Sequence, residues 1–116
     1  LRLHDLMQHY CVLKFNSPRG DIWDFPTLAG SLYKQERTDH PTQKPESLIT
    51  ELLKAYCPKD DAGHYCGTVF DPFHGSGTLG VCCEKLNAEG HQIKWIGAEI
   101  EAHWCEVAAA RLSKVQ

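Results

Sequence analysis

Apolar and polar residues follow one another in blocks that predict three helices and two strands in the last two-thirds of the chain. The first block has helical spacing, and its apolar positions fall on one stripe: Leu48, Ile49, Leu52, Leu53 and Tyr56. Pro45 suits a first helical position, and Pro58 ends the pattern. We therefore expect a helix from Pro45 to Tyr56 that packs against a sheet.

The next blocks predict a β-α-β unit and a further helix. Residues 67–70 form a short apolar run, typical of a buried strand, that ends at Asp71. Turn-forming residues fill 71–78 (DPFHGSGT), helical composition covers 79–86, a second strand covers 93–100 (IKWIGAEI) and a helix covers 102–112. This order predicts an α/β fold in which two parallel strands are joined by a right-handed crossover.

The N-terminal part has a weaker pattern. Residues 10–13 favour a short strand, and residues 16–40 have mostly loop composition. With 116 residues the chain has room for one compact domain. We divide it into a loop-rich segment, residues 1–39, and a ligand-binding β-α-β part, residues 40–116.

Composition narrows the class of protein. Apolar residues make up 42% and charged residues 23%, as in ordinary water-soluble globular proteins. Apolar runs are far shorter than a bilayer span, and Arg2, His4 and Asp5 interrupt any signal peptide, so we expect a cytoplasmic protein without membrane contact. The net charge is −3, and the acidic excess lies in residues 46–116, which leaves the near-neutral first part as the side that a polynucleotide could approach.

The six cysteines favour neither a metal site nor disulfides. They form no CxxC pair, and Cys82 and Cys83 are adjacent within a predicted helix, where they cannot easily converge on one ion. The seven histidines are equally scattered. We therefore predict buried free thiols and no metal site.

The glycine-rich turn is the first candidate for chemistry. Between a strand and a helix, glycines let the backbone approach a ligand closely, and the helix amides attract a negative group. A plain turn is the alternative. A P-loop requires Lys after its last glycine, whereas Gly77 precedes Thr78. Residues 75–80 fit GxGxxG, but Asp71 would repel a diphosphate and instead suits a positive or hydrogen-donating group.

A second carboxylate, Glu99, stands near the end of the second predicted strand. In β-α-β sites an acidic residue at this place receives ribose hydroxyls, usually about 20 residues after the first strand. Glu99 follows Asp71 by 28 positions, and the polar loop 87–92 accounts for the excess. A ligand that joins adenosine to an amino acid matches both carboxylates.

Several of these strings together resemble one family. His40-Pro-Thr-Gln-Lys-Pro45, the helix with Leu48 and Ile49, and residues 69–78 (VFDPFHGSGT) are similar to the paired cofactor motifs of the N4-cytosine/N6-adenine DNA methyltransferases. Residues 96–100 (IGAEI) and the last helix, with Ala109 and Arg111, resemble the next elements of that family. The similarity covers residues 40–112, and DIWDFP at 21–26 resembles the loop that often precedes them.

The resemblance implies a partial Rossmann-like fold that binds S-adenosylmethionine and acts on DNA. Asp71 would lie at the carboxyl edge of the first strand, Glu99 would take the ribose hydroxyls and Ile100 would flank the adenine. The residues expected to wrap the methionine portion are Phe73, Gly75, Ser76, Gly77 and Thr78, with Thr42, Gln43 and Lys44 closing it from the other direction.

The family's catalytic motif, (D/N/S)PP(Y/F/W), holds and stacks the flipped target base, and this sequence contains no such string. We therefore assign no catalytic residue. In one permuted order of the family that motif comes first, and the chain begins at Leu1, so we expect an N-terminal portion that carries it. We expect the 116 residues alone to bind the cofactor weakly or not at all and to transfer no methyl group. A non-catalytic adenosine-binding module, or a subunit completed in trans, is the alternative.

Overall fold

The structure, a computed structural model, describes Phe25 and residues 34–115. Its elements in chain order are α2 (Glu46–Tyr56), β1 (Cys66–Asp71), α3 (Thr78–Ala88), β2 (Gln92–Gly97) and α4 (Ala102–Ser113). The strand expected at 10–13, most of the loop expected at 16–40, and DIWDFP except Phe25 lie outside the described residues.

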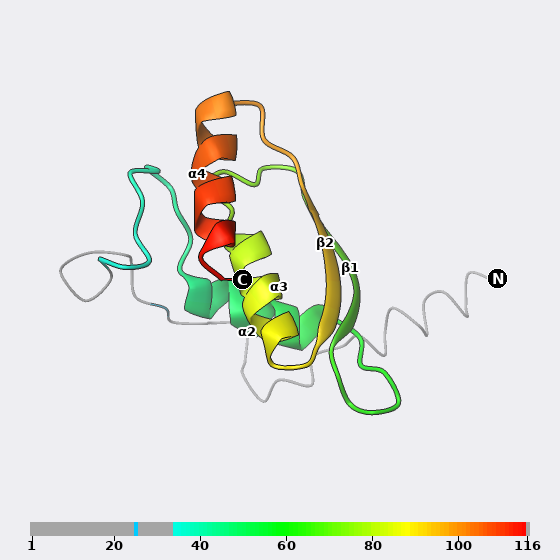
Figure 1. The fold of residues 1–116 in the computed structure, drawn as a ribbon. Coiled ribbons are helices and arrows are strands. Elements are labelled where there is room, and N and C mark those ends of the chain that lie inside the picture. Colours follow the sequence, from blue (N-terminus) through cyan, green and yellow to red (C-terminus); the bar gives the residue numbers. More distant parts are fainter. Residues whose placement is uncertain (1–24, 26–33, 116) are drawn as a thin grey trace.

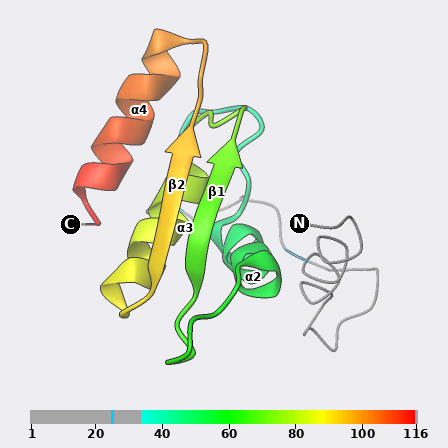
Figure 2. The same cartoon turned by 90° about the vertical axis from the view of Figure 1, so that its right-hand side faces the viewer.

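The two strands form a parallel pair, which confirms the predicted α/β class. Their register runs from Cys66 opposite Gln92 to Asp71 opposite Gly97. Helix α3 connects them, and all three helices lie on the same side of the sheet (Figures 1 and 2). Figure 2 looks onto the other side of the strands, which no described helix covers. Both strands end beside the turn that leads into α3.

The core fills the space between α2, α3 and the covered side of the sheet. Leu53 of α2, Cys83 and Leu86 of α3, and Ile93 of β2 are buried together. Half-buried apolar side chains surround this cluster, Val69 and Trp95 among them. Helix α2 packs chiefly on α3, so its expected packing on the sheet is mostly indirect.

Several element boundaries differ from the sequence prediction. Pro45 is the N-cap of α2 in extended conformation (ψ 137°), and not its first helical residue. Helix α3 begins at Thr78 because Gly77 has a φ of +83°, a left-handed conformation that an α-helix cannot contain. Strand β2 ends at Gly97, three residues before the predicted end, because Ala98 hydrogen bonds to the turn after β1.

The cysteines in the described part of the chain are free thiols: Cys57, Cys66, Cys82, Cys83 and Cys105. Cys82 and Cys83 are fully buried, and burial raises their pKa to about 11 and about 12, which keeps both thiols protonated and unreactive. Within residues 34–115 and Phe25, no group of His, Cys, Asp or Glu has the arrangement of a metal site. None of the described helices has the length and apolar character needed to cross a membrane.

Candidate functional site

The carboxyl ends of β1 and β2 are joined by backbone hydrogen bonds that build the floor of the site. The Ala98 amide donates to the Asp71 carbonyl, and the His74 amide donates to the Ala98 carbonyl, each at 2.9 Å. Asp71 Oδ1 accepts the amide of Phe73 at 3.0 Å. These contacts fix the first residues of the turn against the residue that follows β2.

Two positions of the turn require glycine, because any other residue there would be strained. Gly75 has a φ of +52° and Gly77 a φ of +83°. A Cβ on Gly77 would lie 2.7 Å from the Cβ of Ala108 on α4, and one on Gly75 would lie 2.9 Å from Nε2 of His40. The turn therefore lies between α4 and the segment that precedes α2. Its buried last residues open α3, whose first amides lack intrahelical acceptors.

Glu99 is joined to the turn. Its Oε2 accepts the amide of Gly75 at 2.8 Å, and its Oε1 accepts the amide of Glu101 at 2.9 Å. Hydrogen bonds from the amides of Glu101, Gly75 and Ile100 lower the pKa of Glu99, although desolvation opposes them. The carboxylate is therefore ionised at neutral pH, and the amides leave part of its acceptor capacity for a ligand.

Two large apolar side chains at the same end of the sheet are almost fully exposed to solvent. Phe73 is 88% exposed and Ile100 is 97% exposed. Large apolar groups exposed to this degree next to two carboxylates are suited to contacting a partly apolar ligand. The structure thus brings Asp71, Phe73, Gly75, Glu99 and Ile100 to one end of the sheet, as the sequence suggested.

The segment from Thr42 to Lys44 lies beside the turn, but its side chains have different partners. Gln43 Oε1 accepts hydrogen bonds from the amide and hydroxyl of Thr38, and its Nε2 donates to the Glu36 carbonyl at 2.7 Å. Gln43 thus holds residues 36–38 and does not face the carboxylates. Thr42 and Lys44 are exposed, and the Thr42 amide donates to His40 Nδ1. The residue of this segment that contacts the turn is His40, which lies beside Gly75. The ring centroids of His40 and Trp104 are 4.4 Å apart.

Arg111 of α4 is a supporting residue whose role the sequence did not reveal. Its Nη1 donates to the carbonyl and hydroxyl of Ser76 at 2.8 and 3.1 Å and to the Thr78 hydroxyl at 3.1 Å. Its Nη2 pairs with Glu46 at 3.1 Å, and Glu46 also binds Lys85. Arg111 therefore ties the end of α4 to the turn and to the start of α2, and it occupies the side chains of Ser76 and Thr78.

His74 is the second supporting residue. Its side chain is 7% exposed and stacks on Trp95 with ring centroids 5.3 Å apart. Neither ring nitrogen has a hydrogen-bond partner among the residues that the structure describes, and Nδ1 lies 3.7 Å from Oδ2 of Asp71. Burial lowers the pKa of His74, and the carboxylates of Asp71 and Glu99 oppose this effect in part.

Neither supporting residue has a local sequence signal that would have revealed it. Ser76 lies 35 positions from Arg111, so no helical or strand periodicity connects them. His74 stands within the glycine-rich turn, where no periodic pattern marks a buried position. A basic residue in the last turn of a helix usually only complements the helix dipole.

Comparison with known proteins agrees with the motifs. A family model described as DNA methylase, for N6 and N4 methyltransferases, matches residues 5–110. A type II methyltransferase from Haemophilus parainfluenzae, M.HpaI, is 36% identical over 101 residues, which are 84% of this chain and 28% of that protein.

Two further relatives show the same coverage. M.ScaI, a type II methyltransferase of Streptomyces caespitosus, is 33% identical over 79% of this chain and 27% of its own length. M2.LlaDCHI, a type II methyltransferase of Lactococcus lactis subsp. cremoris, is 34% identical over 81% of this chain and 30% of its own length. The chain therefore spans less than a third of these relatives.

Proposed function

Because the chain belongs to the N6/N4 DNA methylase family, we propose that residues 40–116 form the S-adenosylmethionine-binding part of a DNA amino-group methyltransferase. The observation that carries this proposal is the pair of carboxylates at one end of two adjacent parallel strands, with Asp71 as the last residue of β1 and Glu99 two residues after the end of β2. A glycine turn that opens α3 lies between them. We propose that this part belongs to a Rossmann-like sheet.

The residues present fit the proposed cofactor. Among residues 34–115, Asp71 Oδ2 is approached by Nδ1 of His74 at 3.7 Å, and it suits the ammonium group of the methionine portion. Glu99 is ionised and suits the ribose hydroxyls. The start of α3 suits the carboxylate of the methionine portion. Exposed Phe73 and Ile100 suit the adenine and the thioether carbons.

The cofactor would supply the methyl group, and the described residues would bind and orient it. In this role Gly75 and Gly77 let the backbone approach the ligand, and Arg111 holds the turn from behind. The direct contacts predicted for Ser76 and Thr78 would then be made by their backbone, since Arg111 holds their hydroxyls. Thr42, Gln43 and Lys44 would act by placing His40 beside Gly75.

DNA is the proposed substrate, with N4 of cytosine or N6 of adenine as the acceptor. The proposal draws on the family and on relatives named type II methyltransferases, which support a restriction–modification setting. The cytoplasm is the proposed location. The chain contains no (D/N/S)PP(Y/F/W) string to hold the target amine. We therefore assign cofactor binding, and not methyl transfer, to these residues.

Titration calorimetry of the chain with S-adenosylmethionine, NAD and ATP tests the proposal. Of the two outcomes expected from the sequence, weak binding or none, the geometry favours weak but saturable binding of S-adenosylmethionine, in the high micromolar range or weaker. We expect no comparable binding of NAD or ATP. Asp71→Ala should weaken that binding about tenfold or more, because it removes the only carboxylate proposed for the ammonium group. The matched control is Asp61→Ala, which removes an exposed carboxylate from the link between α2 and β1.

Two outcomes would contradict the proposal. Tight ATP binding that Asp71→Ala leaves unchanged would favour an adenosine-binding module of another kind. Transfer of labelled methyl groups to duplex DNA by the 116 residues alone would show that they hold a catalytic site that we do not assign.

A further inference from the structure

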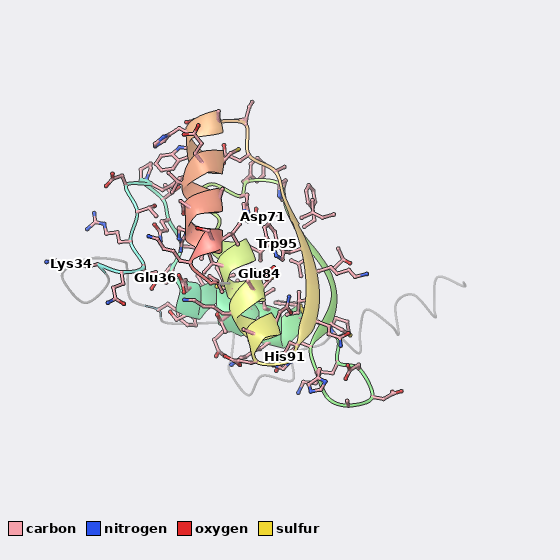
Figure 3. The ribbon with its side chains drawn as sticks, viewed as in Figure 1. Lys34, Glu36, Asp71, Glu84, His91 and Trp95 are labelled. Atoms are coloured by element: carbon pink, nitrogen blue, oxygen red, sulfur yellow. The ribbon has the colours of Figure 1, made fainter. Side chains whose placement is uncertain are left out.

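His74 lies at the proposed cofactor site, where the burial of its side chain favours the neutral ring. The side chain is 7% exposed, and one face of the ring lies on Trp95, whose Nε1 is fixed by Glu84 at 2.8 Å. Figure 3 shows Trp95 between Asp71, at the end of the strands, and Glu84 on α3. Both ring nitrogens are buried and have no hydrogen-bond partner in the described part of the chain.

The sequence is shaped around this ring. A Cβ on Gly97 would lie 2.5 Å from Cγ of His74, and a Cβ on Gly77 would lie 3.3 Å from its Nε2. Gly97 does not have a positive φ, so backbone conformation does not require glycine at this position. The His74 ring explains why a larger residue does not fit there. His74 is thus a fitted part of the site's floor.

The carboxylate of Asp71 lies beside the ring. Oδ2 lies 3.7 Å from Nδ1, which is too long for a hydrogen bond but within ion-pair distance for a protonated ring. The other charged groups that face His74 are Glu99 after β2 and Arg111 on α4, whose effects on its charge are opposite in sign. His40 lies on the far side of Gly75.

We propose that His74 is a positioning residue that makes cofactor binding depend on pH, because its protonated ring competes with the cofactor's ammonium group for Asp71. This inference rests on the proposed function. With a neutral ring, the charge of Asp71 is available to the ligand. With a protonated ring, two cations share one carboxylate and repel each other, so binding weakens as the pH falls.

The test compares two ligands at pH 7.0 and pH 5.0 by calorimetry. S-adenosylmethionine carries the ammonium group at both values, since α-amino groups titrate near 7.7–8.0. 5′-Methylthioadenosine has the adenosine and the sulfur but no amino-acid portion. We expect the Kd of S-adenosylmethionine to rise about fivefold or more at pH 5.0, and that of 5′-methylthioadenosine to change less than about twofold.

Two variants test whether the pH dependence of binding comes from His74. His74→Phe keeps a ring that cannot be protonated, so the ratio of the two Kd values for S-adenosylmethionine should fall to near one. His64→Asn removes an exposed histidine far from the turn and should keep the wild-type ratio. Equal pH dependence for both ligands would overturn the inference, because the effect would then not act through the ammonium group at Asp71.

NMR titration of the histidine ring protons in the unaltered chain gives a readout that does not depend on a variant's folding. S-adenosylmethionine should lower the pKa of His74, and Asp71→Asn should lower it in the free chain. If neither S-adenosylmethionine nor Asp71→Asn moved the pKa of His74, the inference would be overturned while the proposed function would still hold. Absence of saturable binding at pH 7.0 would instead overturn the proposed function on which the inference rests.

Discussion

The two faces of the sheet carry similar residues and have different surroundings. On one face Ile93 is 2% exposed, and it packs with Leu53 and Leu86. On the other face Ile96, three positions later in the same strand, is 57% exposed, and its cross-strand partner Phe70 is 60% exposed. All three helices lie on the side of the first face, and α3 is the helix that packs chiefly against the strands (Figure 2).

The difference shows which apolar residues hold the described fold together. Parallel strands usually read as continuous apolar runs because both of their faces are covered. Val69-Phe70 and Trp95-Ile96 have this composition, but only Val69 and Trp95 pack against the described core. The same kind of side chain therefore contributes unequally to stability. The supporting contacts of the turn, made by Arg111 and His74, also lie on the covered side.

The largest expected effect is a loss of stability, and it comes from replacing one of two isoleucines of β2 that lie on opposite faces of the sheet. Ile93→Ala should lower the free energy of unfolding by about 3 kcal/mol, because it removes fully buried methyl groups and leaves a cavity. Ile96→Ala should lower it by less than about 1 kcal/mol, since that side chain is mostly in water. Urea unfolding followed by circular dichroism measures both, and equal losses would contradict the contrast.

A somewhat smaller loss of stability is expected when the hydrogen bonds of Arg111 to the turn are removed. Arg111→Ala should lower the free energy of unfolding by about 2 kcal/mol, because the largely buried oxygens of Ser76, Thr78 and Glu46 lose their donor. It should also weaken S-adenosylmethionine binding by loosening the turn. Lys114→Ala, an exposed cation one turn further on, is the control and should be near neutral. Equal stability of the two variants would show that the Arg111 contacts are weak.

Gly97→Ala should cost about 1–2 kcal/mol, because the new methyl group would overlap the His74 ring. The double variant Gly97→Ala/His74→Ala should recover part of this loss, since the ring that causes the overlap is gone. A double-mutant cycle on thermal unfolding measures the coupling between the two residues. Strictly additive losses would mean that the ring moves away freely.

The smallest expected effect is a dependence of stability on pH. Burial lowers the pKa of His74, so the unfolded chain takes up a proton at higher pH than the folded chain does. The free energy of unfolding should therefore fall as the pH drops below about 6.5, the ordinary value for histidine. His74→Phe should show a shallower decline from pH 7 to pH 5 in urea titrations. An identical decline would assign it to other groups.

Much of the fold and part of the site could be predicted from local patterns. The apolar stripe of residues 48–56 predicted α2, and short apolar runs on either side of the glycine turn predicted the parallel strands. The strand end after Gly97 could not be predicted, because the residues from Ala98 to Ile100 keep an apolar pattern. Their backbone partner lies in the turn after Asp71, which periodicity does not include.

By itself the sequence determined the α/β class, the order of elements, the placement of Asp71 and Glu99 at neighbouring strand ends, and the family. These features depend on spacing, turn chemistry and motif residues within short stretches of chain. Only the tertiary structure decided that Gln43 holds residues 36–38, that Arg111 occupies Ser76 and Thr78, and that His74 lies buried beneath Asp71. Arg111 reaches residues 33 to 65 positions away, and such pairs follow from how helices pack on the sheet.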